Sequence, residues 1–405
     1  MMARWMGMML VGLTADAAQV WKFDFGSDRP VDGFLRVAAD EKFTPETGFG
    51  FDLVGQPVEE SRGVTGKGGF SFSVTVRPGN YRVTVTLGGV EEASDTTVKA
   101  ESRRLMVNSL KTEAGSTRQT SFVVNVRNSG IPGGKRVKLK DREKPYLHWD
   151  DKLTLEFLGP RPALDRLVIE EASDATTVFL LGDSTVTDQP FAPWNSWGQM
   201  LPVFFDDRVA IANHAESGES VRSSLAALRF EQVYRTLKPG DFVMFQFGHN
   251  DMKDTRPGAL EAYRRNLIEA VVRIRELGGH PVLVTPMERK AGVRGPTLGA
   301  YPDTVRNIAA EAEVPLIDLH QTSRILYRGL GSHLGAAFQD GTHHTNFGSY
   351  LLACCVAVGI AREVPPLALH LKKGLQEFDP AHPMNPESLV IAVSSVSDLA
   401  KPDGE

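Results

Sequence analysis

A change of hydrophobic pattern near residue 174 constrains the fold of this chain more than any other feature of its sequence. Before it, short runs such as residues 70–76 and 81–87 alternate apolar with polar side chains. After it, short runs such as residues 177–181 are apolar throughout. Alternation is typical of strands with one buried face, whereas continuous runs are typical of strands buried on both faces. The chain therefore contains two regions that are built differently.

The first region, residues 19–173, is expected to be a β-sandwich. Its runs 70–76 and 81–87 flank Pro78-Gly79-Asn80, which predicts a hairpin. No long helical pattern interrupts the region, and many short strands with Gly/Pro turns favour two packed sheets. Further strands are expected at residues 21–25, 96–101, 104–107, 121–126, 153–158 and 164–170.

The second region, residues 174–365, is expected to be a three-layer α/β/α domain with a parallel sheet. Continuous apolar runs alternate with helical patterns, which is typical of a parallel sheet covered on both faces. The strands are expected at residues 177–181, 209–212, 242–247, 282–285 and 316–319, and the helices at 220–237, 259–278, 302–313, 323–334 and 347–363. In such sheets ligands bind at the edge formed by the carboxyl ends of the strands.

The two ends of the chain are treated separately. Residues 1–18 contain one basic side chain, an apolar run at 5–13 and small residues at 15–17, which predicts a signal peptide and a secreted or periplasmic protein. Residues 366–405 are proline-rich and are expected to form an extended tail that can pack on the body, and the sequence assigns no chemistry to it.

Composition excludes several classes of function. The 405 residues carry 45 Lys+Arg and 50 Asp+Glu, so the net charge of −5 does not indicate a nucleic-acid partner. No apolar run approaches the ~20 residues of a membrane helix, so no membrane partner is expected. The two cysteines, Cys354 and Cys355, are adjacent and cannot form a disulfide framework. The oligomeric state stays unknown.

Four polar, Gly-containing stretches fall at the expected carboxyl edge: residues 182–185, 216–219, 248–251 and 340–343. Among them Ser184 is a candidate nucleophile, because a serine hydroxyl becomes reactive when a nearby base takes its proton. His343 is the candidate base, and Asp340, three residues earlier, can hold its other ring nitrogen. The backbone N–H groups of Ser184 and Gly218 and the amide of Asn250 can donate to an oxyanion. No cofactor and no metal are expected.

These stretches, in this order, resemble the four blocks of the SGNH (GDSL) hydrolases. More narrowly, the sequences of residues 179–186, 196–199, 247–251 and 340–343 resemble bacterial rhamnogalacturonan acetylesterases. Residues 23–27 and 98–106 resemble the galactose-binding-like β-sandwich module that often precedes them. The resemblance implies Ser184 as nucleophile, His343 as base, Asp340 as its partner, Ser184, Gly218 and Asn250 as the oxyanion hole, and an acetylated polysaccharide as substrate.

Other interpretations stay open at this point. The same stretches fit a broad short-chain carboxylesterase or arylesterase, or an acetylxylan esterase. A metal-dependent phosphoesterase is a further alternative, since Asp183, His214, Asp251, Asp340 and His343 can supply ligands, although paired His-x-His or HExxH motifs are lacking. A non-catalytic carbohydrate-binding protein is the third.

Several side chains have a structural interpretation beside the functional one. Asp183 is expected to brace the loop after its strand, and His249 to make a structural hydrogen bond. Trp194 and Trp197 either pack in the core or form a sugar-stacking wall. His344, directly after His343, is expected to face the substrate cleft or the neighbouring chain.

Overall fold

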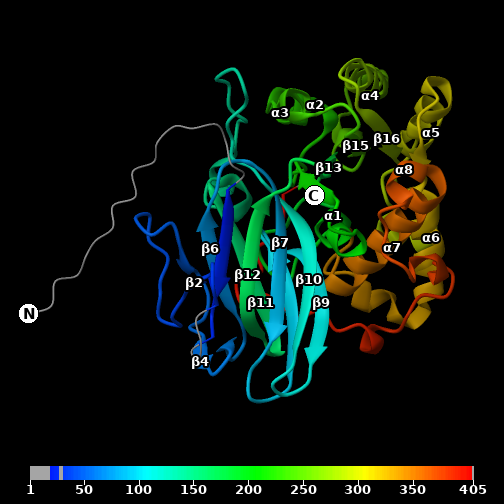
Figure 1. Cartoon of the computed structure of the whole chain (residues 1–405). Coiled ribbons are helices and arrows are strands. Elements are labelled where there is room, and N and C mark those ends of the chain that lie inside the picture. Colours follow the sequence, from blue (N-terminus) through cyan, green and yellow to red (C-terminus); the bar gives the residue numbers. More distant parts are fainter. Residues whose placement is uncertain (1–18, 27–30, 404–405) are drawn as a thin grey trace, which may run out of the picture.

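A computed structural model describes residues 19–26 and 31–403 of the chain (Figure 1). The leader expected at residues 1–18 lies outside the described residues. The first half of the described chain consists of the strands β1 (Val20–Asp24), β2 (Leu35–Arg36), β3 (Phe49–Phe51), β4 (Val58–Glu60), β5 (Gly63–Thr65), β6 (Phe70–Thr75), β7 (Gly79–Gly88), β8 (Ser94–Ala100), β9 (Arg104–Thr112), β10 (Thr117–Val126), β11 (Lys152–Arg161) and β12 (Ala163–Glu171). Two 3₁₀ turns, η1 (Asp141–Glu143) and η2 (Leu147–Trp149), lie between β10 and β11.

These strands belong to two sheets that share one cluster of buried side chains. The strands β3, β6, β11, β8 and β9 form a five-stranded sheet, while β10, β7, β12, β1 and β2 are neighbours in a larger sheet. The shared cluster includes Phe72 and Val74 of β6 together with Val83 and Val85 of β7. The region is therefore rich in strands, as its alternating pattern predicted.

The hairpin expected around Pro78-Gly79-Asn80 is wrong. β6 pairs with β3 and β11, whereas β7 pairs with β10 and β12, so this turn carries the chain from one sheet to the other. Alternation specifies which side chains of a strand share a face, but not which strand lies beside it. Both runs do turn their apolar side chains into the same core.

The second half alternates strands with helices. Its strands are β13 (Thr176–Gly182), β14 (Val209–Asn213), β15 (Phe242–Gln246), β16 (His280–Val284) and β17 (Leu316–Ile317). Its α-helices are α1 (Trp197–Met200), α2 (Val221–Ala226), α3 (Arg229–Thr236), α4 (Ala259–Glu276), α5 (Tyr301–Ala312), α6 (Leu319–Leu330) and α7 (Asn346–Glu363), and its 3₁₀ turns are η3 (Leu201–Phe204), η4 (Asp251–Lys253), η5 (Lys290–Val293) and η6 (Gly331–Ala337). The helix expected at 220–237 is divided at Leu228, whose φ of 66° is left-handed.

Helices cover both faces of these strands. The strands are neighbours in the order β14, β13, β15, β16, β17, and every pair is parallel. Val178 and Leu180 of β13 join side chains of α1, α6 and α7 in one buried cluster. Phe179 and Leu181 join side chains of α3, α4 and α5 in another. The continuous apolar runs thus correspond to strands buried on both faces, as predicted.

One feature of the sheet was not foreseen from the sequence. β10 of the first half pairs in parallel with β14, through Val123 with Ala210 and Val124 with Ile211. The larger sheet consequently runs without a break from β17 to β2. The division into domains at residues 19–173 and 174–365 stays a prediction, and the two regions are joined by backbone hydrogen bonds.

The C-terminal segment is mostly irregular and returns to the body of the protein. It contains α8 (Pro365–Ala368), η7 (Leu375–Glu377) and η8 (Pro386–Ser388). Its far end, red in Figure 1, lies along the loop that follows β13. The Ala192 N–H donates to Val396 O at 3.1 Å, and the Asp398 N–H donates to Ala192 O at 2.9 Å. Within residues 19–26 and 31–403, no helix has the length and apolar composition needed to cross a bilayer.

Candidate active site

The structure brings Ser184, His343 and Asp340 into one hydrogen-bonded row. Ser184 follows β13, and Asp340 and His343 lie in the loop before α7. Oγ of Ser184 lies 2.9 Å from Nε2 of His343, and Nδ1 of His343 lies 2.8 Å from Oδ2 of Asp340. Since the carboxylate accepts from Nδ1–H, Nε2 is left as the acceptor for the serine hydroxyl. This arrangement can activate a serine hydroxyl for attack on an ester.

The environment of Asp340 keeps its carboxyl group ionised. Its Oδ1 accepts from the backbone N–H groups of Thr342 at 2.7 Å and of His343 at 2.6 Å. Partial burial opposes ionisation, but the hydrogen bond from the His343 ring and those two backbone bonds outweigh it and lower the pKa of Asp340 well below its usual value. Lys401 of the C-terminal segment adds a positive charge, with Nζ 3.6 Å from Oδ2.

Asp183 and His249 brace the loop that carries Ser184, as predicted. Oδ1 of Asp183 accepts from the backbone N–H of Thr185 at 2.9 Å and from its hydroxyl at 2.7 Å. Oδ2 lies 3.1 Å from Nδ1 of His249, whose Nε2 lies 3.0 Å from Met287 O. Burial opposes ionisation of Asp183, yet the His249 ring and the bonds from Thr185 lower its pKa. Three loops at the sheet edge are thereby fixed to one another.

The loop of residues 216–219 carries Gly218, one of the three candidate oxyanion donors, and is bonded to the loops that carry the other two, Ser184 and Asn250. Gly218 has a φ of 80°, a left-handed conformation that a side chain at this position would strain. Nδ2 of Asn250 donates to Glu219 O at 3.0 Å, and this amide nitrogen carries a second hydrogen. Nε2 of Gln189 donates to Ser184 O at 2.8 Å and lies 3.3 Å from Oγ of Ser217. These bonds connect the Asn250 and Ser184 loops to the loop that holds Gly218.

Asp251, a possible metal ligand from the sequence, fastens the next element. Its Oδ1 accepts from the backbone N–H of Val221 at 2.9 Å, at the start of α2. Burial raises the pKa of Asp251 to about 7. Within the described part of the chain, no group of three or more His, Cys, Asp or Glu side chains is arranged to hold a metal ion.

Side chains from the first half of the chain also hold the 216–219 loop, which sequence reasoning missed. Nζ of Lys140 donates to Ser217 O at 2.5 Å and lies 3.2 Å from Oε1 of Glu219. Nη2 of Arg142 donates to Oε1 of Glu216 at 2.5 Å and to Ser217 O at 3.0 Å. Burial, with the nearby Glu143 charge, raises the pKa of Glu216 to about 7. The N-terminal region thus positions part of the candidate oxyanion hole.

The C-terminal segment, to which the sequence assigned no chemistry, reaches the same place. In addition to the Lys401 contact with Asp340, Asp403 forms an ion pair with Arg142. A Cβ added to Gly218 would lie 3.1 Å from the Asp403 Cβ. Trp194 Nε1 donates to Asp398 O at 3.1 Å. The segment therefore connects the candidate triad with the candidate oxyanion loop.

His343 and His344 face different surroundings. The Nε2 atom of His344 lies 3.0 Å from the Tyr327 hydroxyl, and its ring centroid lies 4.2 Å from that of Phe338. Burial and the neighbouring His343 lower the pKa of His344 to about 3, so the ring is neutral. His344 thus packs against a neighbouring segment of the same chain, and the alternative expectation, that it faces the substrate cleft, is wrong.

The two tryptophans, Trp194 and Trp197, also lie in different surroundings. Trp197 is buried in the core, with Nε1 donating to Oε1 of Gln246 at 2.8 Å. Trp194 lies edge-on to the His343 ring, with centroids 5.7 Å apart and planes at 85°. Cys354 and Cys355 are buried free cysteines in α7.

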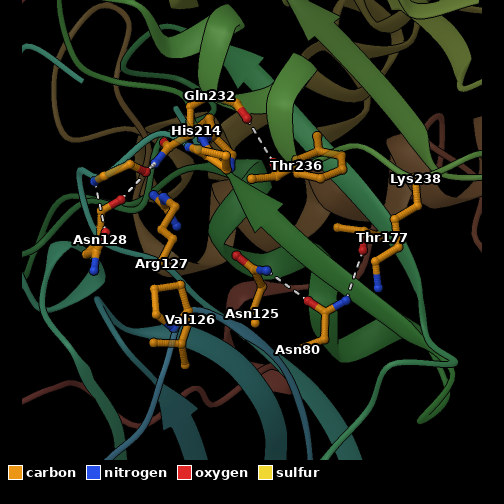
Figure 2. A pocket seen from close by; sticks show the side chains of 15 residues that line it. Asn80, Asn125, Val126, Arg127, Asn128, Thr177, His214, Gln232, Thr236 and Lys238 are labelled. Carbon is orange, nitrogen blue, oxygen red and sulfur yellow. Dashed lines mark hydrogen bonds between the residues drawn. The ribbon is translucent and has the colours of Figure 1, made fainter. Parts of the chain in front are cut away.

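A separate cavity of about 420 Å³ lies where the two halves of the sheet join (Figure 2). His214 lines it together with Arg127 and an amide chain in which Asn125 donates to Asn80 at 2.8 Å and Asn80 donates to Thr177 at 2.9 Å. In the described structure its lining contains no member of the Ser184–His343–Asp340 row. His214 is therefore placed apart from that row.

Comparisons with known proteins show which family the second half of the chain resembles. The model of the GDSL-like lipase/acylhydrolase family matches residues 180–349. Over 216 residues the chain is 35% identical to the rhamnogalacturonan acetylesterase RhgT of Bacillus subtilis, a match that covers 48% of this chain and 93% of RhgT. It is 26% identical over 362 residues to YxiM, an uncharacterized esterase of the same species, covering 81% of this chain and 87% of YxiM. The crystal structure of YxiM matches at 23% identity with a TM-score of 0.46, covering 85% of this chain and 98% of that one.

The similarity to RhgT extends over nearly the whole of that enzyme at 35% identity. The chain therefore belongs to the GDSL-like lipase/acylhydrolase family. All four polar stretches that the sequence singled out lie within the residues that the family model matches.

Proposed function

We propose that this protein is a carbohydrate O-acetylesterase that releases acetate from an acetylated polysaccharide, with pectic rhamnogalacturonan as the first candidate. The hydrogen-bonded row of Ser184, His343 and Asp340 is the observation that carries the proposal. The similarity to RhgT, a rhamnogalacturonan acetylesterase, supports the choice of acyl group and substrate.

In the first half of the reaction, Oγ of Ser184 attacks the acetyl carbonyl carbon while Nε2 of His343 takes the hydroxyl proton. The tetrahedral intermediate carries a negative oxygen. When it collapses, the bond to the sugar oxygen breaks, and His343 gives its proton to that oxygen. The products are a free sugar hydroxyl and an acetyl ester on Ser184. Asp340 holds the His343 ring and stabilises its transient positive charge.

In the second half, water attacks the acetyl–Ser184 carbonyl carbon while His343 takes one of its protons. Collapse of this intermediate returns the proton to Oγ of Ser184 and releases acetic acid, which ionises to acetate. The free enzyme is thus regenerated, and water is the second reactant beside the ester.

The oxyanion of both intermediates is held by the backbone N–H groups of Ser184 and Gly218 and by the free amide hydrogen of Asn250. Support comes from the loop geometry: Gln189 and Glu219 link the three residues, while Lys140 and Arg142 fix the intervening loop. A single preorganised donor of this kind is typically worth about 2.7–4 kcal/mol in the transition state.

Acetate release from a panel of substrates tests the proposal. The panel contains acetylated rhamnogalacturonan, acetylated xylan and p-nitrophenyl esters of two to twelve carbons. We expect acetate from at least one polysaccharide, with rhamnogalacturonan preferred, and a fall in kcat/KM as the acyl chain lengthens. Preference for acetylated xylan would identify an acetylxylan esterase. Hydrolysis of the short p-nitrophenyl esters at similar rates, without acetate release from either polysaccharide, would identify a broad carboxylesterase. Preference for long acyl chains would contradict the proposal.

Two other functions are tested with the same preparation. Hydrolysis of bis-p-nitrophenyl phosphate that depends on added zinc or manganese would favour a metal-dependent phosphoesterase. Binding of polysaccharide without any acetate release would favour a non-catalytic carbohydrate-binding protein.

We also propose that the N-terminal strands form a β-sandwich of the galactose-binding-like type, because two sheets share one buried cluster. Export of the protein to the periplasm or the medium is part of the same proposal, since a polysaccharide is too large to cross a membrane unaided. Sequencing the N-terminus of the protein recovered from its host tests the export, and cleavage near residue 18 is the expected result.

A further inference from the structure

Two neighbouring cavities lie beside the candidate triad and share one wall. The first, of about 350 Å³, is lined by Gln189, Trp194, Ser217, Asp398 and residues 400–403. The second, of about 250 Å³, lies against the outer side chains of the five-stranded sheet. Their common wall consists of Pro145, Tyr146, Pro190 and Phe191.

The first cavity adjoins the reacting groups through two contacts. Gln189, in its lining, donates to Ser184 O at 2.8 Å. Trp194, also in the lining, lies edge-on to the ring of His343. The first cavity therefore lies next to the loop that carries Ser184 and next to the ring of His343.

The shared wall presents two half-buried aromatic rings. Tyr146 and Phe191 have ring centroids 6.1 Å apart and planes at 86°, so that the edge of one meets the face of the other. Tyr146 lies between β10 and β11 of the N-terminal region, and Phe191 lies in the loop after β13. The wall is thus made jointly by the two halves of the chain.

The second cavity continues this path and has a polar group at its side. Arg103 lines it and donates through Nη1 to Gln189 O at 3.1 Å and to Trp194 O at 2.9 Å. Its Nε and Nη2 atoms have no hydrogen-bond partner among the described residues. Arg103 therefore fixes the loop of residues 189–194 from behind.

The first cavity combines the aromatic rings and prolines of the wall with polar and charged side chains, among them Gln189, Glu216 and Lys401. This combination suits a pyranose, whose ring has apolar C–H faces and a polar rim that offers hydrogen-bonding hydroxyls. With one sugar in the first cavity, the next sugar of a chain lies along the shared wall and extends toward the second cavity.

We infer that Tyr146 and Phe191 form a sugar-binding subsite that the N-terminal region contributes to the esterase cleft, and that the natural substrate is a chain of at least two sugar residues. This inference rests on the proposed function and deepens it. The subsite makes the N-terminal region part of the substrate cleft rather than a separate binding module. A free acetylated monosaccharide occupies the first cavity alone and makes no contact in the second.

The test is the ratio of kcat/KM for acetylated oligosaccharides to kcat/KM for p-nitrophenyl acetate. The probes are acetylated rhamnogalacturonan and xylan fragments of one to six sugar residues. We expect Tyr146→Ala and Phe191→Ala to lower this ratio about tenfold or more, mainly through KM. Tyr146→Phe, which keeps the ring, should stay within threefold of wild type. Phe34→Ala, a half-buried phenylalanine that lines neither cavity, is the matched control and should leave the ratio unchanged.

The outcomes separate this inference from the proposed function. If wild type releases no acetate from any carbohydrate, the proposed function fails and the subsite with it. If wild type does so and the ratio is unchanged in both alanine variants, the subsite alone is wrong. An equal loss on oligosaccharides and on p-nitrophenyl acetate, with an intact circular dichroism spectrum, also overturns the subsite, because it places the rings in support of the triad.

Discussion

The adjacent residues His343 and His344 allow the candidate base to be separated from a structural ring by single substitutions. His343 lies 2.9 Å from Oγ of Ser184, whereas His344 lies 3.0 Å from the Tyr327 hydroxyl. The perturbations are therefore His343→Ala and His344→Ala, with His344→Gln as a variant that retains a hydrogen-bond acceptor.

His343→Ala removes the group that takes the serine proton and later protonates the leaving sugar. Comparable losses of a triad histidine lower kcat by roughly 10⁴–10⁶-fold, which corresponds to about 5–8 kcal/mol of transition-state stabilisation. Because this ring is buried too, truncation also lowers stability, and kcat is compared at equal concentrations of folded enzyme.

His344→Ala acts on stability instead. The side chain is buried against Phe338 and Tyr327, so its truncation leaves a cavity that costs about 2–5 kcal/mol. The Tyr327 hydroxyl also loses its contact with the His344 ring and keeps only the long one to the Met287 sulfur at 3.8 Å, at a further cost of about 1–3 kcal/mol. His344→Gln keeps an acceptor near this hydroxyl and should lose less stability. The kcat of the folded fraction should stay within about tenfold of wild type in both variants.

The low pKa of His344 adds a dependence on pH with a definite sign. Burial lowers this pKa from 6.5 to about 3, so between these values the unfolded chain binds a proton that the folded protein does not. Stability from this group is complete above pH 6.5 and is lost as the pH falls toward 3. At pH 5 the loss is roughly 2 kcal/mol, from 1.36 kcal/mol per unit. Since His344→Gln has no such group, its stability deficit should narrow by about that amount between pH 7 and pH 5.

Two assays check this set of expectations. Hydrolysis of p-nitrophenyl acetate is measured with the concentration of folded enzyme set by circular dichroism, and urea unfolding is measured at pH 7 and pH 5. An inactive, folded His344→Gln beside an active His343→Ala would refute the reasoning and require a different base. A stability deficit of His344→Gln that does not change with pH would refute the buried neutral state of the ring.

The remaining predictions concern the nucleophile, the oxyanion hole and metals. Ser184→Ala should lower kcat by several orders of magnitude with an unchanged melting temperature. Adding His343→Ala should lower kcat little further, because the two residues act as a unit. If Ser184→Ala retains more than a tenth of the wild-type kcat, Ser184 is not the nucleophile. Asn250→Ala should lower kcat on p-nitrophenyl acetate by roughly 10²–10³-fold with little change in KM, and a loss confined to KM would contradict the oxyanion assignment. Treatment with EDTA should leave this activity unchanged, whereas a loss that zinc or manganese restores would favour a metal site.

The parallel half of the fold could be predicted because its signals are local. The run from Thr177 to Leu181 is apolar on both faces, and the strand found there is buried by helices on both sides. The positions of Ser184 and His343 followed from topology, since parallel strands bring their carboxyl ends to one edge. Residues 159 positions apart in the chain therefore meet within 2.9 Å.

The features that were missed depend on pairing between distant segments. The alternation in β6 and β7 identified their buried faces but could not show that the two strands join different sheets. The parallel pairing of β10 with β14 has no counterpart in local periodicity. Arg142 and Lys401 each reach the site from outside the predicted catalytic region, and a single charged side chain leaves no periodic pattern to detect it. The proline content of the C-terminal segment predicted an extended conformation, but it could not show where on the protein this segment packs.

Labelling with a fluorophosphonate, followed by peptide mass spectrometry and acetate assay, tests the central claim of a Ser184 acyl-enzyme most directly. The account predicts a single adduct on the peptide that contains Ser184, no adduct in Ser184→Ala, and loss of acetate release in proportion to the labelled fraction. Fully labelled protein that still releases acetate at the wild-type rate, or inactivation through an adduct on another residue, would contradict it.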